Sequence, residues 1–132
     1  MRITLDTNVL ISAFITTQGI ASRVLLRGIE EHEVCLSHYI LREFKEKLIG
    51  KLRYPPFLVE AFLRFLMSRT RVVLDDASVV SSRFSDPKDI PILHLLEVSG
   101  AHYFVTGDKK LLELKKYGKT LILSLREALE LL

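Results

Sequence analysis

The sequence contains little cysteine and lacks long apolar runs, and each absence excludes a class of protein. Cys35 is the only cysteine in 132 residues, which excludes a disulfide framework and a zinc site built from cysteines. Because it lies between Val34 and Leu36, we expect a buried thiol. The longest apolar runs, such as residues 9–11 and 121–123, are far too short to span a bilayer.

Repeats, low-complexity tracts and linkers are also missing from the chain. A chain of 132 residues without linkers is expected to form a single domain that spans residues 1–132. Hydrophobic residues make up 48% and charged residues 27% of the chain. This is enough for a core and a soluble surface, so disorder is not indicated. Asp6 interrupts the apolar start of the chain, so we expect no signal peptide and a cytoplasmic protein.

The charge balance is mildly basic, with a net charge of +3 and an isoelectric point of about 9.1. Such a balance is compatible with a polyanionic partner. Basic residues crowd two segments, which contain Arg42, Lys45, Lys47, Lys51 and Arg53, and Lys109, Lys110, Lys115, Lys116 and Lys119. Each group is either the solvated face of a helix or a binding surface.

Apolar patterns of strand and helix type alternate along the chain. Short β-branched and apolar runs predict strands at residues 3–5, 34–37, 71–74, 103–106 and 120–123. Helical patterns lie between them, near residues 9–14, 20–29, 38–50, 56–68, 86–99 and 109–117, and after the capping box at 124–127. Residues 75–83 predict only a connection. This alternation predicts a three-layer α/β/α domain with a central parallel sheet of about five strands.

Four acidic residues occupy equivalent places in this pattern. Asp6 follows the first strand and Asp108 the fourth, Glu43 lies early in the helix after the second strand, and Asp89 lies in the first turn of the helix before the fourth. Taken singly, each has an ordinary explanation, since Asp6 or Asp108 can cap a helix and Asp89 would suit a helix dipole. In a parallel sheet, however, we expect all four to reach the carboxyl edge, where ligands bind.

Several carboxylates at one edge repel one another unless a cation neutralises them. Folding does not require this arrangement, because Ser, Thr or Asn would cap a helix equally well. Ligands that are all oxygen, without a cysteine or histidine cluster, favour Mg²⁺ or Mn²⁺ over zinc. The four histidines, His32, His38, His94 and His102, are scattered. A metal-dependent phosphodiester enzyme is the natural inference.

Four motifs extend this inference: LDTNVL at 5–10, Ser37 with Glu43 six residues later, DPKDIPIL at 86–93 and VTGDKKLL at 105–112. Together, and in this order, they resemble the PIN-domain family of small ribonucleases, which includes toxins of VapC type in toxin–antitoxin systems. The resemblance implies that the metal-binding acids are Asp6, Glu43, Asp89 and Asp108, braced by Asn8 and Thr106. Asp86 either caps a helix or approaches a second metal.

The resulting hypothesis is hydrolysis of RNA phosphodiester bonds with Mg²⁺ or Mn²⁺. Phosphate contacts are expected from the basic residues nearest the acids, Arg42, Lys45, Lys109 and Lys110. Family resemblance implies a 5′-phosphate product, an antitoxin partner and a homodimer, for which residues 58–66 supply either an interface or core. Two alternatives remain: an inactive PIN-fold module that binds RNA or protein, and a phosphotransfer domain using Asp6. The latter class has a second Asp where this chain has Asn8.

Overall fold

The computed structural model describes residues 1–74 and 89–132. Six strands form one sheet in the order β3-β2-β1-β4-β6-β5. Their bounds are β1 Arg2–Leu5, β2 Glu33–Ser37, β3 Arg71–Val73, β4 Tyr103–Val105, β5 Lys116–Tyr117 and β6 Thr120–Leu123. All neighbours pair in parallel except β5 and β6, which pair antiparallel. The five predicted strands are confirmed.

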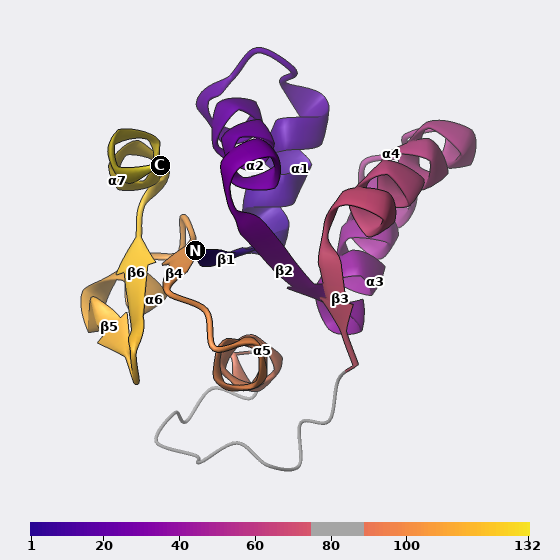
Figure 1. Cartoon of the computed structure of the whole chain (residues 1–132). Coiled ribbons are helices and arrows are strands. Elements are labelled where there is room, and N and C mark those ends of the chain that lie inside the picture. Colours follow the sequence, from indigo (N-terminus) through magenta and orange to yellow (C-terminus); the bar gives the residue numbers. More distant parts are fainter. Residues whose placement is uncertain (75–88) are drawn as a thin grey trace.

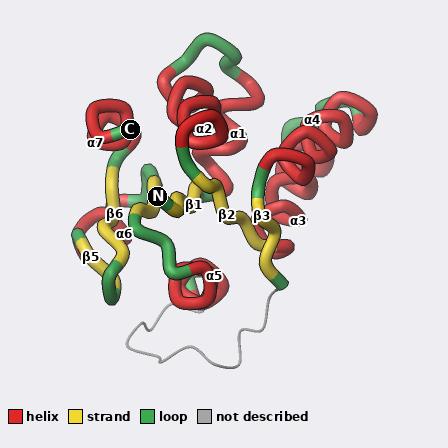
Figure 2. The backbone as a smooth tube through the Cα atoms, viewed as in Figure 1, coloured by secondary structure: helices red, strands yellow, loops and turns green. Residues whose placement is uncertain are grey.

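Helices cover both faces of this sheet. They are α1 Thr7–Ile15, α2 Ile20–Glu31, α3 His38–Glu46, the π-helix η1 Lys47–Lys51, α4 Pro56–Arg69, α5 Ile90–Ser99, α6 Lys109–Leu114 and α7 Leu125–Leu131. In Figure 1, α1, α2 and α7 lie on one side of the sheet and α5 on the other, with α3 and α4 near the β3 edge. The yellow strands of Figure 2 run between these red helices. The predicted three-layer α/β/α architecture is therefore present.

The central strands bury their apolar side chains almost completely, as parallel strands covered on both faces do. Ile3 and Leu5 of β1, Leu36 of β2 and Phe104 of β4 are each at most 1% exposed. Cys35 is buried as predicted. Within the described residues, no single helix is long and apolar enough to cross a membrane. By length and composition only the pair α1 and α2 qualifies, and it is bent by 108°.

A cluster of aromatic rings fixes α3 against α1 and α4. Phe14 of α1 makes edge-to-face contacts with Phe44 at 5.9 Å, Tyr54 at 5.3 Å and Phe62 at 5.3 Å between ring centroids. Phe44 stacks on Phe62 at 5.6 Å. Aromatic pairs of this kind add to the stability of the fold, on top of the contribution from the apolar area that they bury. Because Phe44 is the neighbour of Glu43 in the sequence, this cluster also sets the position of that acid.

Two helices end differently from the sequence prediction. The helix predicted to continue to Gly118 ends at Leu114, since Lys115 adopts a φ of 60° and the next two residues form β5. The helix predicted over 38–50 is α-helical only to Glu46 and continues as η1. The described part of α5 begins at Ile90 with Asp89 at its N-cap position, whereas the predicted start at 85–87 and the connection at 75–83 lie outside the described residues.

Candidate functional site

Asp6 is placed at the carboxyl edge of the sheet by the register of two central strands. Leu5 of β1 pairs with Val105 of β4, and the Asp6 amide continues this ladder by donating to the Val105 carbonyl at 3.0 Å. The Asp6 Oδ1 accepts a hydrogen bond from the Thr7 amide at 2.8 Å. Asp6 therefore caps α1, which is the ordinary role considered for it in the sequence. Its other carboxylate oxygen, Oδ2, has a different partner.

That second oxygen is held by Thr106, a fully buried residue directly after β4. Thr106 Oγ1 donates to Asp6 Oδ2 at 2.7 Å and accepts from the Asp108 amide at 3.0 Å. Asp108 Oδ1 in turn accepts from the Lys110 amide at 2.9 Å and caps α6. One hydroxyl thus links the turn after β1 to the turn after β4.

The four predicted acids line one cavity of about 120 Å³. The described residues that line it are Asp6, Asn8, Tyr39, Glu43, Lys47, Asp89, Ile92, Asp108 and Leu111. Asp89 is buried, at 8% exposure. No three acidic, histidine or cysteine side chains in residues 1–74 and 89–132 are close enough to form a metal-holding group. The acids therefore surround the cavity instead of meeting at one point.

The electrostatics of this cavity disfavour a charge on Asp6. Burial raises the pKa of the Asp6 carboxyl above its ordinary value of 3.8, and the nearby carboxylates of Glu43 and Asp108 raise it further. The hydrogen bonds from Thr106 and Thr7 lower the pKa in part. A cation among these oxygens would remove the repulsion. The donor chemistry therefore fits Mg²⁺ or Mn²⁺, which prefer carboxylate and amide oxygens.

Glu43 has two partners that were not predicted from the sequence, Tyr39 and Lys47. The Tyr39 hydroxyl donates to Glu43 Oε2 at 3.3 Å, and burial together with the Glu43 charge raises the pKa of Tyr39. Lys47 Nζ lies 3.9 Å from Glu43 Oε1 and donates to Asn8 Oδ1 at 3.4 Å. Sequence spacing could have indicated both partners, because residues four apart on a helix share a face. Glu43 lies four positions after Tyr39 and four before Lys47.

The four basic residues proposed for phosphate contact separate into two places. Arg42 and Lys45 line a different surface cavity of about 540 Å³, and Lys45 Nζ pairs with Glu60 Oε1 at 3.5 Å. Lys109 and Lys110 are exposed in the first turn of α6, next to Asp108. Lys109 and Lys110 thus lie beside one of the four acids, whereas Arg42 and Lys45 line a cavity that contains none of them.

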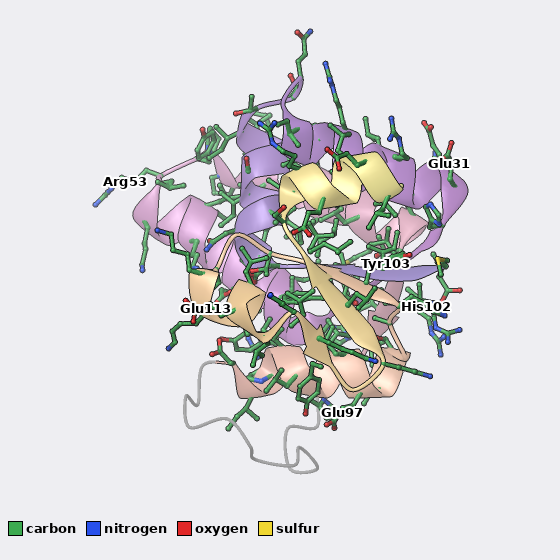
Figure 3. All side chains as sticks on the ribbon, turned by 90° about the vertical axis from the view of Figure 1, so that its left-hand side faces the viewer. Glu31, Arg53, Glu97, His102, Tyr103 and Glu113 are labelled. Atoms are coloured by element: carbon green, nitrogen blue, oxygen red, sulfur yellow. The ribbon has the colours of Figure 1, made fainter. Side chains whose placement is uncertain are left out.

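None of the four histidines is among the described residues that line the acid-lined cavity. His102 precedes β4, where its Nδ1 accepts from the Arg2 amide at 3.0 Å. In Figure 3 it lies at the opposite end of the view from Glu113 on α6, the helix that follows the carboxyl end of β4. Asp86, the other acid considered for metal binding, lies outside the described residues.

Comparisons with known proteins agree with this architecture. A family model described as the PIN domain matches residues 2–110, and no curated protein matches the chain. One similar solved structure is that of VapBC2 from Rickettsia felis bound to a DNA fragment from their promoter. It has 15% identity and a TM-score of 0.70, with 94% of this chain and 98% of that chain covered.

A second similar structure is DNA-bound VapBC from Salmonella typhimurium, with 18% identity and a TM-score of 0.65. The match covers 95% of this chain and 98% of that chain. At these identities the likeness shows the fold, which confirms the predicted PIN-like architecture. The family match confirms the resemblance that the four sequence motifs indicated.

Proposed function

Because the chain belongs to the PIN domain family, we propose that it is a metal-dependent ribonuclease and the toxin of a toxin–antitoxin pair. The observation that carries this proposal is the convergence of Asp6, Glu43, Asp89 and Asp108 on one cavity at the carboxyl edge of the sheet. A fold alone does not define a function, whereas four acids around one cavity have a chemical consequence. An inactive PIN-fold module would not need to keep this repulsive set of charges.

Asp6, Glu43, Asp89 and Asp108 are the residues that would hold Mg²⁺ or Mn²⁺, with Asn8 beside them in the cavity. When bound, such an ion lowers the pKa of a coordinated water and offsets the charge that develops on a phosphate. Thr106 orients the Asp6 carboxylate by its 2.7 Å hydrogen bond, and Tyr39 restrains Glu43 from the previous turn of α3. These contacts fix the acids before substrate arrives, which saves the cost of ordering them during the reaction.

The direct test is cleavage of RNA by the purified protein in the presence of Mn²⁺. We expect a panel of single-stranded and structured RNAs to contain substrates that are cut with Mn²⁺ or Mg²⁺ and left intact with EDTA, and to yield 5′-phosphate ends. Matching DNA strands serve as the comparison for substrate class. RNA binding without cleavage under any metal condition would reject the enzyme and favour the RNA-binding module.

Phosphate binding by basic residues predicts a strong dependence of RNA affinity on salt. Each phosphate contact to a single strand contributes a slope of about 0.7 in log affinity against log salt. We expect Lys109→Gln, in a cleavage-deficient Asp89→Asn background, to reduce this slope by about 0.7 in fluorescence anisotropy titrations. Lys119→Gln removes the same charge beside Gly100, near Arg2 at the amino edge of the sheet, and should leave the slope unchanged. Equal slopes in all three proteins would remove Lys109 from the RNA surface.

Partner binding is proposed for the apolar surface between α2 and α4. A cavity of about 140 Å³ lies there, with Leu25, Leu26, Phe62 and Phe65 among its lining residues. On α4, Val59 is fully buried while Phe57 is 70% exposed, so this helix supplies both core and surface. Exposed apolar side chains on α4 make this helix the proposed contact surface for an antitoxin or a second copy of the chain.

A further inference from the structure

One of the side chains that line the acid-lined cavity is positively charged. Lys47 is the one positively charged side chain among the described residues that line the cavity. Its ammonium lies between two chain segments, 3.9 Å from Glu43 Oε1 on α3 and 3.4 Å from Asn8 Oδ1 on α1. The Lys47 side chain is 32% exposed, so it reaches the acids from the rim while retaining contact with solvent.

The backbone at this point is unusual and fixes Lys47 on the side of the cavity. Lys47 is the first residue of η1, the π-helix that follows α3. Single π-turns are rare and occur frequently at functional sites. Leu48, the next residue, is completely buried and anchors this turn in the core. The position of Lys47 is therefore set by packing, while its flexible side chain is free to change partners.

Both contacts of the ammonium are long. Strong hydrogen bonds from nitrogen to oxygen measure about 2.7–3.2 Å, and partly exposed ion pairs contribute little to stability. The Lys47 contacts are thus adequate to offset negative charge in the cavity and weak enough to be replaced. A divalent cation that bound Glu43 Oε1 would compete with the ammonium for that oxygen and would repel it at short range.

We propose that Lys47 is the resident counter-ion of the acid cavity and that a divalent cation displaces it from Glu43 and Asn8. Lys47 therefore sets the affinity for metal, because the incoming ion competes with an ammonium already in place. In the metal-free protein the same ammonium offsets the negative charge of Glu43. This inference deepens the proposed function, because it concerns the same cavity.

The test uses Mn²⁺ alone, measured by isothermal titration calorimetry on the full chain without RNA. Lys47→Met retains the aliphatic length but removes the charge, and we expect it to bind Mn²⁺ roughly two- to fivefold more tightly, in keeping with the strength of such pairs. The melting temperature of the metal-free variant should fall, so that Mn²⁺ raises it by more than in the parent. Lys47→Arg should behave as the parent does.

Lys45→Met is the matched control, since Lys45 lies two residues away, pairs with Glu60 and lines a different cavity. It should leave the Mn²⁺ affinity unchanged, which separates a local exchange from a general effect of net charge. Unchanged or weaker Mn²⁺ binding by Lys47→Met overturns the proposal. Mn²⁺ binding without RNA cleavage would reject the proposed function while leaving this result standing.

Discussion

Asp6→Asn is expected to abolish Mn²⁺-dependent RNA cleavage without lowering the melting temperature of the metal-free protein. Activity should fall roughly 100-fold or more, because even the outer partners of metal ligands cost 10–100-fold when replaced. Stability should hold, since burial and the neighbouring carboxylates raise the pKa of Asp6 and the substitution removes this unfavourable charge. Asn also remains a good N-cap for the Thr7 amide.

The raised pKa of Asp6 also determines whether the stability of the metal-free protein rises or falls with pH. Because the folded pKa of Asp6 lies above its ordinary value of 3.8, the folded state binds the proton more tightly than the unfolded state. The contribution of Asp6 to the free energy of unfolding therefore falls as the pH rises from 3.8 through the raised value. Urea titrations should show a flatter pH profile for Asp6→Asn than for the parent across this window.

Asp6→Ala separates the capping role from the metal role. Alanine removes the cap as well as the charge, and a lost N-cap costs about 1 kcal/mol. Both variants should be inactive, but only Asp6→Ala should be less stable without metal. Mn²⁺ at about 100 times its dissociation constant should stabilise the parent by about 2.7 kcal/mol and both variants much less. Retained cleavage in Asp6→Asn, or its marked destabilisation, would contradict a metal role for this carboxylate.

The sequence predicted those features of the site that follow from chain direction. In a parallel sheet, a residue directly after a strand lies at the carboxyl edge, so Asp6 and Asp108 were predictable from their positions after β1 and β4. Glu43 required one further step, the spacing from the Ser37 cap of α3. Ser37 Oγ accepts from the Ile40 amide at 3.2 Å and starts the helix as predicted.

The features that escaped prediction depend on contacts between distant segments or on local backbone geometry. The bond between Thr106 and Asp6 joins residues 100 positions apart, and only the register of β1 on β4 brings them together. Strand β5 depends on the turn around Lys115 and Gly118, both of which have a positive φ. Tyr117, within this strand, then donates to Glu97 Oε1 of α5 at 2.6 Å. Helical periodicity shows neither feature.

Thr106→Val is expected to destabilise the protein although it changes neither the net charge nor the shape of a fully buried side chain. Valine keeps the shape of the buried side chain but leaves Asp6 Oδ2 without the hydroxyl donor and the Asp108 amide without its acceptor. A buried group left unsatisfied costs about 1–3 kcal/mol, and because both of these groups are only partly buried we expect a loss at the lower end of that range. Urea unfolding of the metal-free protein at pH 7 measures this loss, and NMR titration of the Asp6 carboxyl should show its pKa raised further.

Thr106→Ser is the matched control, because serine retains the hydroxyl and loses only a methyl group, at a cost of about 0.8 kcal/mol. Cleavage should survive in Thr106→Ser and fall in Thr106→Val, since the hydroxyl orients the Asp6 carboxylate. The gap in stability between the two variants should narrow as the pH falls through the raised pKa of Asp6, where the protonated carboxyl no longer requires that donor. A gap that stays constant with pH would show that packing, and not the bond to Asp6, accounts for the role of Thr106.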